Sequence, residues 1–162
     1  MKIVYYIGQP GTGKTTKMRS ILAELRKVEE DDLVEDGPVK YHRFNKQKVI
    51  ILGIYDDSTF AGTDRWSKSV GPKFREWLTT NSENYAEWVI YGEGERLSNQ
   101  PNMDAMFNEE SMKLVCLEVS EEELERRRAA RNNTQNESWM KGMKTRIANL
   151  RKRYTHTVEV ID

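Results

Sequence analysis

The segment Gly8–Thr15 constrains the fold of this chain more than any other feature. Its sequence, GQPGTGKT, fits the pattern G-x-x-x-x-G-K-[ST]. A β-branched and aromatic run, Lys2–Ile7, leads directly into it, and apolar residues recur at helical spacing after it, at Met18 and Leu22. A glycine-rich turn between a strand and a helix N-terminus presents backbone amides to an anion. The segment therefore predicts a phosphate-binding loop in an α/β fold.

The glycine, lysine and threonine positions of this loop each have an expected role. Glycines let the backbone approach a phosphate closely, and the inward-pointing amides form a nest for anions. We expect Lys14, as a catalytic residue, to reach the β and γ phosphates, and the Thr15 hydroxyl to bind Mg²⁺. The alternative, a turn that binds nothing, is disfavoured by the flanking strand and helix. The expected nucleotide-binding residues are Gly11, Thr12, Gly13, Lys14, Thr15 and Thr16, and the expected cofactors are ATP and Mg²⁺.

Length and composition indicate one domain, which we expect to span residues 1–162. Lys plus Arg and Asp plus Glu both total 26, so the zero net charge argues neither for nor against nucleic-acid binding. The single cysteine, Cys116, lies in an apolar run and suits a reducing compartment. No apolar stretch approaches the roughly 20 residues of a membrane span, and the N-terminus does not fit a signal peptide. We therefore expect a cytoplasmic protein.

The rest of the chain alternates strands with helices, which predicts a parallel sheet covered on both faces. The acidic stretch 29–37 predicts a loop, and 39–44 predicts an edge strand in a hairpin with 49–55. Residues 56–70 predict a loop, with or without a short helix. We expect an α/β three-layer sandwich of the P-loop NTPase type, with about five parallel strands and a possible extra edge strand. Further strands are expected at 88–91, 114–119 and 158–161, and helices near 71–78, from 120 and around 140–154. Ser120 to Glu123 fits a capping box that begins the second of these helices, and Met143 is one of the apolar residues that mark the third.

Polar residues follow the strands at the edge where open α/β sheets place their chemistry. Asp56-Asp57 follows the second main strand, Gly92-Glu93-Gly94-Glu95-Arg96 the third, and Glu125-Arg126-Arg127-Arg128 the fourth. With the phosphate loop, these segments make nearly the whole chain resemble the nucleoside, nucleotide and polynucleotide kinases among P-loop proteins. The resemblance implies transfer of the γ-phosphoryl group of ATP. A GTPase would need an N-K-x-D segment, and Asn45-Lys46-Gln47-Lys48 lacks its aspartate.

The resemblance also implies roles for the acidic residues. In such kinases a carboxylate after the second strand accepts the proton of the attacking hydroxyl, which makes Asp56 the first choice for the base and Asp57 the second. Glu93 is expected to bind Mg²⁺ with Thr15, while Glu95 and Arg96 resemble an E-R signature that faces acceptor or phosphates. The alternatives are a turn-forming aspartate pair and a plain glycine turn.

The loop between the second strand and the next helix resembles an acceptor-binding segment. Aromatic rings stack on bases, and an arginine can clamp a phosphate. The alternative for Phe60 and Trp66 is packing beneath the loop, which is equally compatible with the sequence. The residues expected to bind the acceptor are Asp57, Phe60, Asp64, Arg65, Trp66, Glu95 and Arg96.

The arginine-rich helix resembles the lid of small kinases, at about 121–138. Arginines over the γ-phosphate stabilise transition-state charge. Arg127 and Arg131, four residues apart, share a helix face, and the resemblance makes them the expected catalytic arginines. Because the chain ends just after its last expected strand, we expect Arg126 or Arg127 to hold the adenine. The alternative is a solvated face with pairs such as Glu123-Arg127.

The loop 62–67 and the segment 92–97 resemble, more narrowly, small bacteriophage P-loop kinases, among them those that phosphorylate 5-hydroxymethyluracil in DNA. This implies an acceptor base in phage DNA and a location in the host cytoplasm. DNA would need stacking aromatics and a basic track. The alternatives are a deoxynucleoside or deoxynucleoside monophosphate kinase and a non-catalytic nucleotide-binding module. Candidates for the DNA contacts are Phe60, Trp66 and Trp139, with Lys40, Arg43, Lys68, Lys73 and Arg75.

Overall fold

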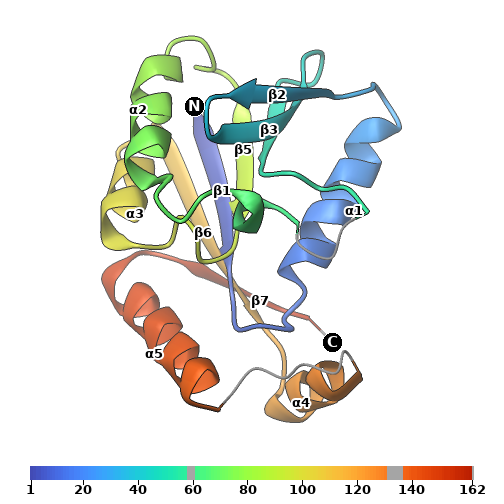
Figure 1. Ribbon diagram of the computed structural model, residues 1–162, viewed down its shortest axis with the longest axis vertical. Coiled ribbons are helices and arrows are strands. Elements are labelled where there is room, and N and C mark those ends of the chain that lie inside the picture. The colour runs from blue at the N-terminus through green and yellow to red at the C-terminus, as the bar shows by residue number, and fades with distance from the viewer. Residues whose placement is uncertain (58–60, 131–136, 162) are drawn as a thin grey trace.

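Strand β1 (Lys2–Ile7) lies inside a single mixed sheet, with parallel neighbours on both sides. The computed structural model describes residues 1–57, 61–130 and 137–161, and within them the sheet has seven strands in the order β2-β3-β4-β5-β1-β6-β7 (Figure 1). The other strands are β2 (Asp32–Asp36), β3 (Val39–Phe44), β4 (Val49–Leu52), β5 (Val89–Glu93), β6 (Ser111–Glu118) and β7 (Thr157–Val160).

The five strands β4, β5, β1, β6 and β7 run parallel, which confirms the predicted α/β sandwich. Inner strands of a parallel sheet are buried on both faces, and the continuous apolar run Ile3–Ile7 of β1 suits that position. Two antiparallel strands, β3 and β2, extend one side of the sheet.

Two local predictions need correction, and one helix was not predicted. The stretch 29–37 is not all loop, because β2 pairs with β3 along its length, and β3 is therefore not the edge strand. Acidic residues are rare in strands, but here they lie on an exposed edge, where charge also discourages pairing with other chains.

Helix α3 (Gln100–Phe107) was not predicted. Its first turn is capped by Asn99, whose side chain accepts a hydrogen bond from the Asn102 amide.

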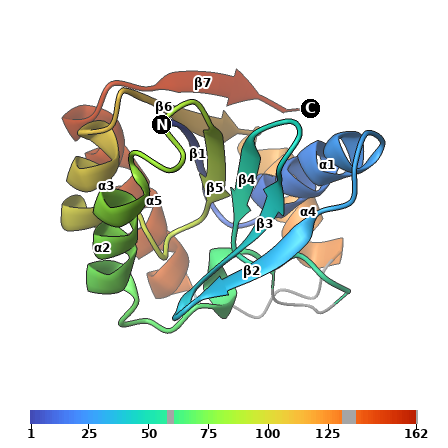
Figure 2. The same ribbon diagram turned by 90° about the horizontal axis from the view of Figure 1, so that it is seen from above.

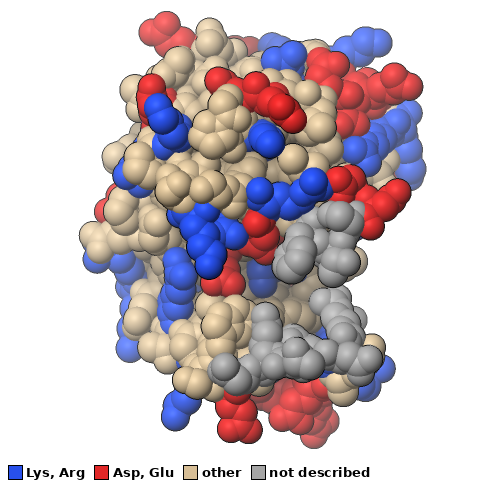
Figure 3. Space-filling model, viewed as in Figure 1, with Lys and Arg blue, Asp and Glu red and all other residues tan. Residues whose placement is uncertain are grey.

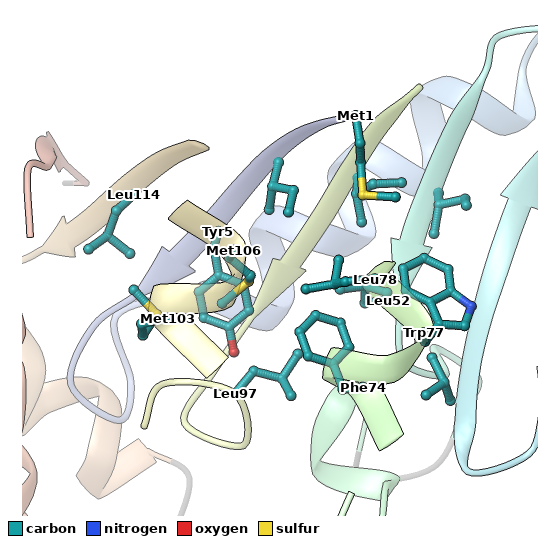
Figure 4. Close-up of a cluster of buried hydrophobic side chains, with 14 of the residues drawn as sticks. Met1, Tyr5, Leu52, Phe74, Trp77, Leu78, Leu97, Met103, Met106 and Leu114 are labelled. Carbon is teal, nitrogen blue, oxygen red and sulfur yellow. The ribbon is translucent and has the colours of Figure 1, made fainter. Parts of the chain in front are cut away.

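Helices cover both faces of the sheet (Figure 2). Helix α1 (Lys14–Arg26) lies on one face with α4 (Glu121–Ala130) at the same side, whereas α2 (Gly71–Asn81), α3 and α5 (Glu137–Arg153) lie on the other. The larger apolar cluster fills the space under α2 and α3, where Phe74, Trp77 and Met103 pack against Tyr5 and Leu52 of the strands (Figure 4). No helix of the described residues is long and apolar enough to cross a membrane.

The carboxyl ends of the parallel strands meet at one end of the sheet, next to α4 and α5 (Figure 1). The phosphate loop follows β1, the segment from Gly53 follows β4, and Glu93 ends β5. After β6, Ser120 caps α4 as predicted, because its hydroxyl accepts a hydrogen bond from the Glu123 amide at 3.2 Å. This end of the sheet is therefore where the polar segments of the sequence converge.

Candidate functional site

The phosphate loop has the backbone that an anion site needs. Gly11 and Gly13 have φ angles of 89° and 95°, a region that glycine enters without strain, and Gly13 is the residue before α1. The Thr12 side chain is buried and donates to the Gln9 carbonyl at 2.8 Å, so Thr12 braces the loop from within. Lys14 Nζ folds over the loop and donates to the carbonyl of Gly8 at 2.7 Å.

A buried carboxylate lies beside this loop. Because Glu93 pairs with Tyr6 in the β1–β5 register, β5 delivers its side chain next to the loop. Glu93 is 5% exposed, and its Oε1 accepts a hydrogen bond from the Tyr55 hydroxyl at 2.9 Å. Burial raises the pKa of the Glu93 carboxyl, and this outweighs the lowering by Lys14 and by hydrogen bonds with Tyr55 and Thr15.

These residues fit a magnesium nucleotide. A buried carboxylate costs desolvation energy that a nearby cation offsets, and Glu93 has both Lys14 and the Thr15 hydroxyl within interaction range. Within the described ranges no group of three or more His, Cys, Asp or Glu residues could hold a metal alone. Mg²⁺ is commonly held by one or two protein oxygens together with substrate phosphates, which Thr15 and Glu93 could supply.

A hollow of about 200 Å³ opens in front of the loop. In Figure 3, acidic and basic side chains meet at the hollowed middle of this face. Two further carboxylate-bearing residues, Asp64 and Glu95, line the hollow together with Trp139 and Met143 of α5. The lining residues are Gly8, Pro10, Gly11, Gly13, Lys14, Thr15, Thr16, Asp64, Glu93, Gly94, Glu95, Trp139 and Met143.

The arginines of α4 differ in where they point. Arg127 Nη1 donates to the Gly11 carbonyl at 3.3 Å, and Arg128 donates to the Pro10 carbonyl at 3.3 Å, so both contact the phosphate loop. The Arg126 side chain is 76% exposed and pairs with Glu123, as does Arg127. The sequence favoured Arg127 and Arg131 and did not single out Arg128. Arg131 lies outside the described residues.

The candidate base is paired with an arginine. The Asp56 carboxylate forms an ion pair with Arg65, and its backbone carbonyl accepts a hydrogen bond from Arg19 Nη2 at 2.8 Å. Asp56 and Asp57 are exposed and neither lines the hollow, whereas Asp64 does. Arg65, which was expected to bind the acceptor, therefore pairs with the candidate base in this structure.

Two other residues expected to bind the acceptor, Trp66 and Arg96, have protein contacts in this structure. Trp66 is 4% exposed, packs against Phe74 in the core and donates its indole N–H to the Lys40 carbonyl at 3.2 Å. The stacking role is therefore wrong for Trp66, and the packing alternative is correct. Arg96 donates to the backbone carbonyl of Asp64 at 3.1 Å and so holds a residue that lines the hollow. Phe60 lies outside the described residues.

Two residues that the sequence did not indicate, Tyr55 and Arg146, hold carboxylates of the site in place. Tyr55 binds Glu93, and Arg146 of α5 contacts the Glu95 carboxylate at 3.8 Å. Met143 had been interpreted only as part of an apolar helix face. The pattern gave no signal for these contacts, because each joins segments that are far apart in the chain.

The fold and the phosphate loop define a P-loop protein. The family described as P-loop Nucleotide Kinase3 matches residues 1–160, and the chain belongs to this family. Membership supports a nucleotide-binding phosphotransferase in general terms. A solved, unliganded sugar kinase from Janibacter sp. HTCC2649 is similar with a TM-score of 0.46 and 15% identity, covering 100% of this chain and 85% of that one. No curated protein matches the chain at a significant level.

Proposed function

We propose that this protein is an ATP- and Mg²⁺-dependent kinase that phosphorylates a hydroxyl group. The observation that carries the proposal is the meeting of Lys14, Thr15 and buried Glu93 at a hollow that the acidic residues Asp64 and Glu95 also line. A phosphorylated acceptor would be repelled by carboxylates at Asp64 and Glu95, whereas a hydroxyl can donate hydrogen bonds to them.

The chain's own residues would divide the work of transfer. Bound Mg²⁺-ATP would supply the phosphoryl group and neutralise part of its charge. The loop amides and Lys14 hold the phosphates, Thr15 and Glu93 supply oxygen ligands, and Arg127 approaches from α4, which we propose as a lid. The acceptor oxygen bonds to the γ-phosphorus as the bond to the β-phosphate oxygen breaks. Asp56 takes the hydroxyl proton, and Arg65 keeps its carboxylate oriented.

The acceptor that we propose is 5-hydroxymethyluracil in DNA, on the basis of the resemblance described above. In the hollow, Trp139 offers an aromatic wall for a pyrimidine ring, and Asp64 and Glu95 offer acceptors for its hydroxymethyl group. Three of the cations suggested for DNA already have protein partners, because Arg43 pairs with Asp32, Lys73 with Glu76 and Arg75 with Asn102. These contacts are at 3.4, 3.4 and 2.7 Å. An exposed ion pair such as Lys73–Glu76 is weak enough to exchange for a phosphate, whereas Asn102 is buried and holds Arg75 from within the protein.

A second candidate is a deoxynucleoside or deoxynucleoside monophosphate kinase. The family description, which names nucleotide kinases, favours it. The same Mg²⁺ and phosphate ligands would serve, with the hollow enclosing a free acceptor instead of a flipped base.

The deciding experiment follows γ-labelled phosphate from ATP to several acceptors. These are duplex DNA with and without 5-hydroxymethyluracil, DNA with a 5′-hydroxyl end, and free deoxynucleosides and monophosphates. We expect label on the hydroxymethylated DNA alone, and a steep loss of transfer as salt rises, because phosphate contacts release counterions. Label on a free nucleoside or monophosphate, with little salt dependence, would establish the second candidate instead.

Replacing Arg127 by alanine is expected to lower kcat by at least about tenfold, because its guanidinium contacts the phosphate loop. Arg126→Ala removes the same charge from the same helix, but the Arg126 side chain is exposed and pairs with Glu123, so we expect a change within about twofold. Steady-state kinetics with the labelled acceptor measure both. Equal losses would mean that α4 acts through its overall charge and not through Arg127.

A further inference from the structure

His42 is a buried histidine behind the site, and both of its ring nitrogens have protein partners. It lies on β3 and is 5% exposed. Its Nδ1 is 2.7 Å from Asp31 Oδ2, and its Nε2 is 3.0 Å from the backbone nitrogen of Tyr55. Asp31 is held in turn by Arg26 Nε at 2.8 Å.

These partners fix the protonation state of the ring. A backbone N–H can only donate, so Nε2 must carry a lone pair when it accepts from Tyr55. The proton therefore sits on Nδ1, where it is donated to the Asp31 carboxylate. The arrangement requires a neutral imidazole of one tautomer.

The contact compensates for the end of a strand. Gly53 still donates to the Lys40 carbonyl of β3 at 2.9 Å, but its φ of 94° then turns the chain away from β3. The Tyr55 amide, in a residue that is 4% exposed, would be left without a backbone acceptor on β3. An unpaired buried N–H costs about 1–3 kcal/mol, and the imidazole of His42 avoids this cost by accepting the hydrogen bond of the Tyr55 amide.

Tyr55 connects His42 to the residues proposed for phosphoryl transfer. Its amide is held by His42, its hydroxyl donates to Glu93 Oε1 at 2.9 Å, and the next residue is Asp56. A line of hydrogen bonds thus runs from Asp31 through His42 and Tyr55 to the carboxylate beside the phosphate loop. A shift of Tyr55 would move both the proposed base and the proposed Mg²⁺ ligand.

We propose that neutral His42, oriented by Asp31, is a positioning residue that fixes Tyr55 and thereby places Asp56 and Glu93 for phosphoryl transfer. The proposal rests on the proposed kinase function. Protonation of Nε2 would replace an acceptor by a donor, so the Tyr55 amide would lose its partner and turnover would fall on the acid side.

The surroundings of His42 set the pH window. Burial lowers the pKa of its imidazole below the ordinary value of about 6.5, the neighbouring Arg26 lowers it further, and Asp31 and Asp56 raise it in part. A lowered folded pKa means that the neutral ring, and the stability it contributes, is fully present above about pH 6.5. That stability is lost as pH falls toward the lower folded pKa. We expect the acid limb of kcat in this range.

The test compares two substitutions of His42 across pH. His42→Leu removes the acceptor and is expected to lower kcat about 10- to 100-fold with the KM for ATP nearly unchanged, because a small misplacement of reacting groups costs that much. His42→Gln carries an amide oxygen the same number of bonds from Cβ as Nε2, so we expect it to restore most of kcat while removing the acid limb. Asp31→Asn removes the anion that favours the protonated ring, so the limb should move to lower pH.

The other histidine, His156, offers a matched control, and His156→Leu should leave the limb in place. Thermal melting confirms that each variant is folded before its kinetics are compared. A His42→Leu enzyme with wild-type kcat, or a His42→Gln enzyme that keeps the acid limb, would overturn the proposal.

Nuclear magnetic resonance separates this proposal from the kinase proposal. The His42 ring should titrate as an Nδ1–H tautomer, and the Tyr55 amide shift should follow the same titration, whether or not any acceptor is phosphorylated. A Tyr55 amide that ignores His42 ionisation would contradict the positioning role alone. Absence of transfer to every acceptor, with the coupled titration present, would contradict the kinase proposal alone.

Discussion

Lys14→Ala is expected to reduce phosphoryl transfer by on the order of 10²–10³ or more, with little change in fold. Lys14 begins α1 and bends back over the phosphate loop, where its ammonium lies near Glu93 and the loop carbonyls. A positive charge at this place stabilises negative charge on the transferring group. A water molecule that fills the space of the removed side chain carries no charge and cannot supply this stabilisation. Transfer of γ-labelled phosphate and the affinity for ATP are measured on the same preparation.

Lys17→Ala is the matched control, because it removes the same charge one turn further along α1. The Lys17 ammonium pairs with Glu159 of β7 at 2.8 Å and does not line the hollow, so we expect transfer to stay within about twofold. If Lys14→Ala left the rate unchanged, the chain would act as a nucleotide-binding module. If both variants lost activity alike, the effect would belong to the electrostatics of α1 as a whole.

The parts of the fold that could be predicted are those where a local pattern has one physical solution. The glycines of the phosphate loop, the apolar run of β1 and the capping serine Ser120 each led to the observed element. The same logic missed β2, because its residues have low strand propensity and are held by the ladder to β3. Strand pairing depends on a neighbour that the local sequence does not reveal.

The candidate site shows the same division. The placement of Glu93 next to the loop follows from the rule that parallel strands end at one edge. The burial of Trp66 does not, since an aromatic residue in a polar loop has the same sequence pattern whether it faces a ligand or the core. The Asp31–His42–Tyr55 contacts join three chain segments, and no spacing within one segment predicts them.

Gly53→Ala is expected to destabilise the protein by more than about 4 kcal/mol, which lowers Tm by about 10 °C or more. A Cβ on Gly53 would lie 2.2 Å from the carbonyl carbon of Gly62 and 2.5 Å from the Thr63 nitrogen. These atoms are backbone, and they cannot move aside as a flexible side chain would. Next to this close approach, the backbone groups of Ile54 and Gly62 form an antiparallel bridge, which joins the two ends of the segment that contains Tyr55 and Asp56. Thermal melting of the purified variant measures the loss.

Gly37→Ala separates the two causes of this loss, because Gly37 also has a positive φ, 59°, but a Cβ there would meet nothing within 4 Å. Strain in the left-handed region alone costs roughly 1–2 kcal/mol, so this control should lower Tm by only a few degrees. The difference between the two variants then measures the close approach of the backbone at Gly53 and Gly62. Equal melting temperatures would mean that the backbone segments at Gly53 and Gly62 can move apart without cost. The close approach of these segments would then not hold the Asp56 carboxylate in position.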